Sequence, residues 1–191
     1  MLVQRDVIHT AKQVASLDLV SNGRVIFGVG VGWSREEMRN HGTDPHTRGA
    51  LINEQLTALK EIWTKDEAEF HGKYIGFNPI FCWPKPVQHP YPPIYIGGDG
   101  GAALARVAAH GDGWMPHAVG TPARARPQLN RLAKVAGNLP IVIASAAPTP
   151  ELIAAYAEAG ADHLTLGLPT LPEAETLRTL DAFAALNTDH R

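Results

Sequence analysis

The chain has 191 residues, of which 45% are hydrophobic and 19% charged, so it forms a globular domain or a large part of one and is not disordered. Its net charge is −2 and no block of basic residues is present, which argues against a nucleic-acid partner. Cys82 is the only cysteine and no apolar run is long enough to cross a bilayer, so a cytoplasmic protein without membrane contact is expected.

The first part of the chain alternates between helical and strand-like patterns. Residues 7–20 are predicted to form a helix because apolar side chains recur on one face, and an Asn-Gly pair ends it. Residues 25–30 form an apolar run that is typical of a strand buried on both faces. The polar segment 34–47 is predicted to be a surface loop with a short helical turn, and residues 48–63 form a second helix with an apolar stripe.

An irregular insertion is predicted at about residues 65–92. Within it, residues 70–74 have the composition of a small hairpin turn. Five prolines between positions 84 and 93 then force extended backbone up to the next strand. Long connections inside compact folds are commonly functional, so a functional role is predicted for this segment.

The most informative stretch is residues 92–114, which read PPIYIGGDGGAALARVAAHGDGW. It predicts a buried strand at residues 94–96, a glycine-rich loop at 97–101, a helix at 102–110 and a further strand at 112–116. Backbone N–H groups and the dipole at a helix N-terminus attract phosphate. An ordinary strand-to-helix turn, in which glycines only satisfy sharp geometry, explains the same residues equally well.

The remaining residues repeat the alternation. Helices are predicted at 129–136, at 149–160 after a Thr-Pro pair, and at 177–184, with strands at 139–144 and 162–167. Strands and helices that alternate in this way predict an α/β fold with parallel strands and right-handed crossovers.

Several stretches together carry a resemblance: AKQVASLDLVSNGR, VIFGVGVGW, HGKY, PKPVQHPYPPIYIGG and GDGW. They resemble the luciferase-like monooxygenase superfamily, and within it the branch that depends on the deazaflavin coenzyme F420. The motifs cover residues 4–117, and the remainder is similar in pattern only. The resemblance implies an α/β fold of the TIM (β/α)8 barrel type, as a single domain over residues 1–191.

The resemblance also implies that the chain corresponds to strands 4–8 of the barrel and lacks the first three strands. A complete barrel needs roughly 200–250 residues or more, and 191 residues with an insertion fall short of that. The end strands of a partial barrel would expose unpaired apolar edges, so either another chain covers them or the sequence is a fragment. A homo-oligomer is therefore expected.

By the same resemblance, the coenzyme phosphate binds in the loop after the fifth barrel strand. Carried over by position, this cofactor-binding loop consists of Gly97, Gly98, Asp99, Gly100, Gly101 and Ala102. Asp99 departs from the expected pattern, because an acid repels phosphate unless it points outward or caps the helix. The turn after the fourth strand, with Gly30, Val31 and Gly32, is expected to flank the cofactor. Enzymes of the family that use FMN often carry an arginine at the position of Val31, so this residue favours F420.

Three further residues are assigned by position to the reacting molecules. Trp33 and Trp114 are expected to contact the substrate, and His117, just past a strand end, is expected to donate a proton. Core or interface packing is the alternative for Trp33, and an exposed loop histidine is the alternative for His117. No metal is expected, since the histidines and the acid between positions 41 and 46 match no standard ligand spacing.

These residues predict an F420-dependent oxidoreductase that transfers hydride between the deazaflavin and a small-molecule organic substrate. The first alternative is an FMN-dependent luciferase-like monooxygenase. The second alternative is a truncated, non-catalytic flavin-binding or structural protein that assembles through its open barrel edges.

Overall fold

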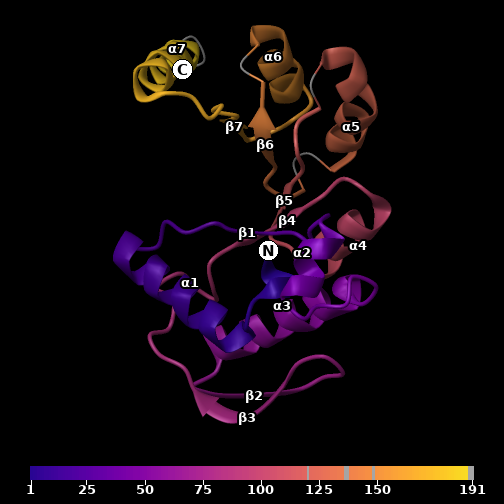
Figure 1. The fold of residues 1–191 in the computed structure, drawn as a ribbon, viewed down its shortest axis with the longest axis vertical. Coiled ribbons are helices and arrows are strands. Elements are labelled where there is room, and N and C mark those ends of the chain that lie inside the picture. Colours follow the sequence, from indigo (N-terminus) through magenta and orange to yellow (C-terminus); the bar gives the residue numbers. More distant parts are fainter. Residues whose placement is uncertain (120, 136–137, 148, 189–191) are drawn as a thin grey trace. The chain divides into compact units, whose positions relative to one another are not determined.

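A computed structural model describes residues 1–119, 121–135, 138–147 and 149–188 of the chain (Figure 1). The contacts between residues divide the chain into two compact units. The first unit comprises Met1–Gly97 and Gly101–Asp112, and the second comprises Gly98–Gly100 and Gly113–Arg191. The single domain expected over residues 1–191 stays a prediction.

The described helices of the first unit are η1 (Leu2–Gln4), α1 (Val7–Ser21), α2 (Arg35–Asn40), α3 (Arg48–Thr64) and α4 (Gly101–His110). Their positions confirm the sequence prediction for each of the three longer helices to within one residue at either end. Asp6 caps α1, because its carboxylate accepts a hydrogen bond from the His9 N–H at 2.8 Å. At its other end α1 stops at Asn22, whose φ of 55° is the left-handed conformation expected of the Asn-Gly pair.

Two short strands form the sheet of the first unit. β1 (Phe27–Val29) pairs in parallel with β4 (Ile94–Gly97), and Gly28 lies opposite Tyr95. The prediction of a strand buried on both faces over residues 25–30 is wrong, since Gly28 is exposed and Ile26 is 46% exposed. The physical reason is that β1 lies at the edge of its sheet among the described strands, so only part of its surface is covered.

The insertion at residues 65–92 contains regular structure, which corrects the sequence prediction. β2 (Glu67–His71) and β3 (Gly76–Phe81) form an antiparallel hairpin (Figure 1). Phe70 lies opposite Phe77, and the two rings stack with their centroids 6.4 Å apart. The turn expected near residues 70–74 is therefore the connection of a real hairpin.

A carboxylate of α3 holds the turn of this hairpin. Glu54 accepts hydrogen bonds from the backbone N–H groups of Lys73, Tyr74 and Ile75 at 3.0, 2.7 and 3.0 Å. A Cβ added to Gly72 would overlap Glu54 Oε2, so glycine leaves the room that this carboxylate occupies. Burial by itself raises the pKa of Glu54, but the three backbone hydrogen bonds and the Lys73 charge lower that pKa below its ordinary value of 4.5.

Replacing Glu54 with glutamine is expected to lower the free energy of unfolding by about 2 kcal/mol at pH 7, because the amide keeps only one acceptor oxygen. Since the pKa of Glu54 is lowered in the folded protein, its contribution is present above about pH 4.5 and is lost as the pH falls through the folded pKa. Urea unfolding of both proteins at pH 7 and pH 3 should therefore give a difference that shrinks at pH 3. The exposed Glu69→Gln on the same hairpin is the control and should cost less than about 0.5 kcal/mol. A difference that is independent of pH would contradict this role of the carboxylate.

A buried aspartate anchors the proline-rich end of the insertion. Asp18 of α1 is 0% exposed, and it accepts hydrogen bonds from the backbone N–H groups of Val87 and Gln88, both at 2.9 Å. Gln88 Nε2 donates to Asp18 Oδ1 at 2.7 Å and to the Val25 carbonyl at 2.8 Å. Asp18 therefore joins α1 to the segment that leads into β4, and Gln88 extends this link to the segment that leads into β1.

The second unit contains β5 (Gly113–Met115), α5 (Pro122–Val135), β6 (Val142–Ala146), α6 (Pro150–Glu158), β7 (His163–Leu166) and α7 (Glu173–Thr188). β6 and β7 pair in parallel, and parallel bridges join Trp114 to Ile141 and His117 to Ala144. The strand predicted over residues 139–144 instead reaches Ala146, because a bulge between Ile143 and Ala146 carries the pairing with β7 further along the chain.

The strands β4 and β6 begin with the same local arrangement. Asp112 Oδ2 accepts a hydrogen bond from the Ile94 N–H at 3.0 Å, and the Asp112 N–H donates to the Ile94 carbonyl at 2.8 Å. Asp162 Oδ2 accepts from the Ile141 N–H at 2.7 Å, and the Asp162 N–H donates to the Ile141 carbonyl at 3.0 Å. Each aspartate is therefore bound twice to the start of an earlier strand.

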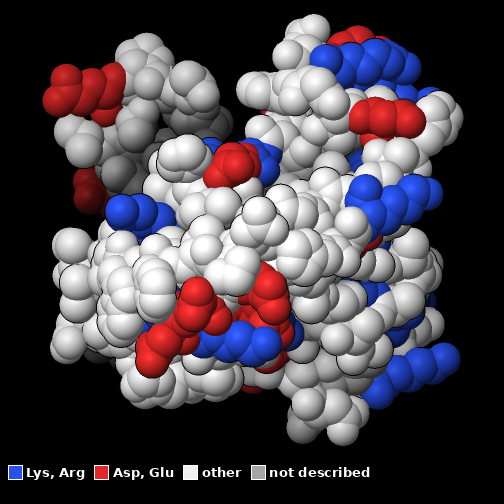
Figure 2. Space-filling view, turned by 90° about the horizontal axis from the view of Figure 1, so that it is seen from below, with Lys and Arg blue, Asp and Glu red and all other residues white. Residues whose placement is uncertain are grey.

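Parallel pairing and intervening helices confirm the predicted α/β class. The described strands do not close into a barrel. Among the described residues, no helix is both long and apolar enough to span a bilayer. Figure 2 shows acidic and basic side chains interspersed on one face, with no continuous basic surface on the part of the chain visible there.

Candidate functional site

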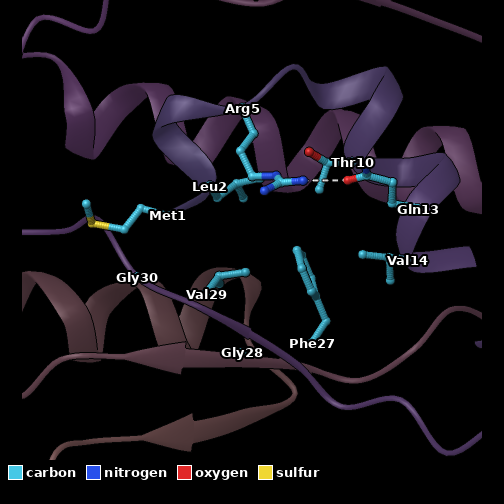
Figure 3. A pocket seen from close by; sticks show the side chains of 10 residues that line it. All are labelled: Met1, Leu2, Arg5, Thr10, Gln13, Val14, Phe27, Gly28, Val29 and Gly30. Carbon is cyan, nitrogen blue, oxygen red and sulfur yellow. Dashed lines mark hydrogen bonds between the residues drawn. The ribbon is translucent and has the colours of Figure 1, made fainter. Parts of the chain in front are cut away.

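A pocket of about 240 Å³ lies between α1 and β1 in the first unit (Figure 3). It is lined by Met1, Leu2, Arg5, Thr10, Gln13, Val14, Phe27, Gly28, Val29 and Gly30. Phe27 and Val29 lie on one side, and on the other Arg5 Nη2 donates a hydrogen bond to Gln13 Oε1 at 2.5 Å (Figure 3). The pocket therefore combines an apolar wall with one guanidinium group.

The turn that was predicted to flank the cofactor follows β1. Gly30 lines the pocket, and Val31 is half-buried. Gly32 has a φ of 75°, and a Cβ added there would overlap the side chain of Met1, so this position requires glycine. Trp33 is 89% exposed, which removes core packing within the first unit as its explanation. Its contact with substrate stays a prediction.

The glycine-rich loop predicted to bind phosphate begins at Gly97, the last residue of β4, and runs into α4. Gly98 has a φ of 109°, a backbone conformation that residues with a side chain rarely adopt. A Cβ added to Gly100 or Gly101 would meet no atom within 4 Å, and Ala102 is exposed. A side chain at position 100 or 101 would therefore contact no neighbouring atom.

Asp99, the acid in this loop, is paired with Arg131 of α5 within the second unit. Arg131 Nη2 donates to Asp99 Oδ2 at 2.6 Å, and Arg131 Nε donates to Asp99 Oδ1 at 3.3 Å. The Arg131 guanidinium balances the negative charge of Asp99 in the predicted phosphate-binding loop. Sequence reasoning missed Arg131, because it lies 32 residues from Asp99 and belongs to no motif.

Trp114 supports the same loop from inside the protein. Its side chain is 0% exposed, and Nε1 donates a hydrogen bond to the Gly98 carbonyl at 2.7 Å. Trp114 therefore fixes the position of the loop backbone at Gly98. Its contact with substrate stays a prediction.

His117 lies just past β5, and its side chain is exposed. Its carbonyl accepts a hydrogen bond from Gln128 Nε2 at 2.8 Å. The Val119 N–H donates to Tyr156 Oη at 2.9 Å, and Tyr156 Oη donates to Gln128 Oε1 at 2.5 Å. Burial raises the pKa of Tyr156, the Val119 N–H opposes this, and the charge of Asp99 raises the pKa further. The protonated Tyr156 and Gln128, both buried, therefore hold the backbone at His117 and Val119.

Two groups of predicted residues come together within the units. Gly98, Asp99 and Trp114 come together with Arg131 in the second unit, and the turn at residues 30–33 lies beside the pocket of the first unit. Across the part of the chain that the structure describes, no three His, Cys, Asp or Glu side chains gather closely enough to hold a metal ion.

Parallel strands that alternate with helices define an α/β protein, a class in which ligands commonly bind at the loops that follow the strands. The chain belongs to the luciferase-like monooxygenase family, which matches residues 1–159.

Relatives in known proteomes support this membership. An uncharacterized protein of Mycobacterium tuberculosis is 34% identical over 172 residues, which cover 87% of this chain and 61% of that protein. The FMNH2-dependent dimethylsulfone monooxygenase of Pseudomonas putida is 40% identical over 96 residues, which cover 49% of this chain and 26% of that enzyme. The chain thus spans about three fifths of the length of the mycobacterial relative, at 61%.

Solved structures are similar in fold. Monooxygenase RslO1 from Streptomyces bottropensis matches with a TM-score of 0.78 and 18% identity, over 98% of this chain and 75% of that one. An F420-dependent secondary alcohol dehydrogenase matches with a TM-score of 0.65 and 20% identity, over 85% of this chain and 69% of that one. The mixed α/β fold therefore matches luciferase-like TIM-barrel structures, while closure of the barrel is not seen among the described strands.

Proposed function

We propose that the protein is an F420-dependent oxidoreductase of the luciferase-like class and that the coenzyme phosphate binds at the loop of residues 97–102. The observation that carries this proposal is local to the chain: glycines connect β4 to the N-terminus of α4, so no side chain at Gly100 or Gly101 covers the first backbone N–H groups of the helix. Unpaired N–H groups and the helix dipole favour an anion at such a position. The fold similarity to an F420-dependent secondary alcohol dehydrogenase supports the choice of coenzyme.

The residues of the loop fit a phosphate group. Gly98 adopts a φ of 109°, which lets the backbone turn sharply. Gly100 and Gly101 have no side chains that would crowd a bound anion. Asp99 does not stand as an isolated negative charge, because Arg131 is bound to both of its carboxylate oxygens. Asp99 therefore adds no unbalanced negative charge beside the loop.

The bound coenzyme would supply or accept the hydride, and the protein would supply position and an environment with little water. Trp114 holds the Gly98 carbonyl and thereby the loop backbone. Trp33, which is exposed after β1, would form an aromatic wall for the ring or the substrate. A ring nitrogen of His117, also exposed, would give a proton to the small organic substrate or take one from it as hydride moves.

Binding of the two coenzymes to the purified chain tests the proposal. We expect F420 to bind more tightly than FMN, and Gly101→Ala to weaken F420 binding about 10-fold because the new methyl group occupies the space for the phosphate. The stability of Gly101→Ala should be unchanged, since the added Cβ meets no atom within 4 Å. Gly76→Ala is the matched control, because its Cβ would lie 3.8 Å from the nearest atom, in the distant hairpin. Unchanged F420 affinity in Gly101→Ala would refute binding at this loop.

A FMN-dependent monooxygenase is the second candidate, and the identity with the FMNH2-dependent enzyme of Pseudomonas putida favours it. Val31 stands against it, because this neutral side chain offers no partner for the FMN phosphate. Retention of FMN but not F420 would decide for this candidate. A stable oligomer that binds neither coenzyme would instead indicate a non-catalytic protein that assembles through the edge of β1.

A further inference from the structure

The second unit contains a pocket of about 400 Å³ whose lining includes none of the residues assigned above to coenzyme or substrate. It lies where three strands end, after β5 at Ala118, at the end of β6 and after β7 at Gly167, and α7 closes one side. Its lining includes Ala118, Ser145, Ala147, Gly167, Thr179 and Phe183. In proteins built from parallel strands, ligands bind beyond the carboxyl ends of the strands, which is where this pocket lies.

Ser145 in this lining has an unusual backbone conformation. Its φ of 58° is left-handed, and it lies in the bulge at which the pairing of β6 with β7 shifts. Asn22 is the other described residue apart from glycine with a positive φ, and it ends a helix, where that conformation is ordinary. The Ser145 N–H donates to Thr165 Oγ1 at 2.9 Å, which holds the strained backbone in place. Strained residues that the surrounding structure maintains cluster at ligand sites.

The side chains of the pocket define the chemistry of its ligand. Ser145 is exposed, and its hydroxyl has no hydrogen-bond partner among the described residues, whereas the Thr179 hydroxyl already donates to the Glu175 carbonyl at 2.8 Å. None of the described residues that line the pocket is charged, and Phe183 contributes an aromatic surface. An ion would lose its water without compensation there, while a neutral molecule with one oxygen would be satisfied.

We propose that this pocket binds a neutral organic ligand through a carbonyl or hydroxyl oxygen that accepts a hydrogen bond from Ser145 Oγ, with its apolar part against Phe183. The identification of this ligand as the substrate rests on the proposed oxidoreductase function. The existence of the site does not, because it is defined by the pocket and by Ser145 alone.

Amide NMR of the full chain, without coenzyme, tests the site. Cyclohexanone is the probe, and cyclohexanecarboxylate is the anionic counterpart of similar shape. We expect cyclohexanone to shift the amide signals of Ser145 and Gly167 in a saturable manner, and the carboxylate to leave them unchanged. Equal shifts with both probes, or shifts elsewhere only, would overturn the proposal.

Two substitutions at one position separate binding from stability. Ser145→Ala and Ser145→Gly both remove the hydroxyl and should weaken cyclohexanone binding about 10-fold. Ser145→Gly should also raise the Tm, because glycine adopts a φ of 58° without strain. Thr57→Val in α3, whose hydroxyl is bonded to the Asn53 carbonyl and does not line the pocket, should bind the probe as the unaltered protein does. Undiminished binding by Ser145→Ala would refute the role of the hydroxyl. Probe binding at Ser145 in a protein that binds neither coenzyme would keep the site and reject the proposed function.

Discussion

Replacing Asp18 with alanine is expected to lower the free energy of unfolding by about 3 kcal/mol. The carboxylate is fully buried and accepts three hydrogen bonds, two from the backbone of Val87 and Gln88 and one from the Gln88 side chain. Alanine leaves these donors without an acceptor in a place that water does not reach. Urea unfolding should show a lower midpoint with an unchanged slope.

A second aspartate on the same helix provides the control. Asp6 caps the N-terminus of α1 through the His9 N–H and is exposed, so Asp6→Ala should cost only about 1 kcal/mol. Amide exchange should increase at residues 87 and 88 in Asp18→Ala and not in Asp6→Ala. Equal losses of stability in the two variants would mean that Asp18 acts as an ordinary helix residue.

Replacing Trp114 with phenylalanine is expected to lower the free energy of unfolding by about 2 kcal/mol and to weaken F420 binding about 10-fold. The ring is fully buried, and its Nε1–H fixes the Gly98 carbonyl at 2.7 Å. Phenylalanine loses this bond and leaves a small void, so the loop backbone can move. Thermal unfolding and the coenzyme titration measure the two effects.

Trp33→Phe is the matched change at the surface. Because Trp33 is 89% exposed, this substitution should alter the free energy of unfolding by less than about 0.5 kcal/mol. If Trp114→Phe keeps full coenzyme affinity while losing stability, Trp114 serves only the core, and the loop does not depend on it.

The elements that could be predicted from the sequence are those with a local signal. The stripe of apolar residues in α3 and the Asn-Gly pair after α1 each lie within one element, and the structure confirms both. The glycines at positions 98 and 100 likewise indicated a sharp, uncrowded loop from their residue type alone.

The features that could not be predicted depend on contacts between distant residues. The hairpin of the insertion is held by Glu54, which lies 19 to 21 residues before the amides that it accepts from. Arg131 lies 32 residues from Asp99, and Asp18 lies 69 residues from Val87. The burial of Trp114 was missed for the same reason. The Gly-Asp-Gly-Trp sequence carries no pattern that distinguishes a tryptophan lining a ligand site from one buried in the hydrophobic core.

The paired hydrogen bonds of Asp112 and Asp162 have a consequence for how such chains evolve. Each aspartate is hydrogen-bonded to the start of an earlier strand only 18 or 21 residues away. These bonds align the strand, the following helix and the segment that ends at the aspartate without help from other parts of the chain. A segment that sets its own alignment depends little on its neighbours for that purpose. Recombination can therefore exchange or duplicate such segments among related proteins while each one keeps its internal geometry.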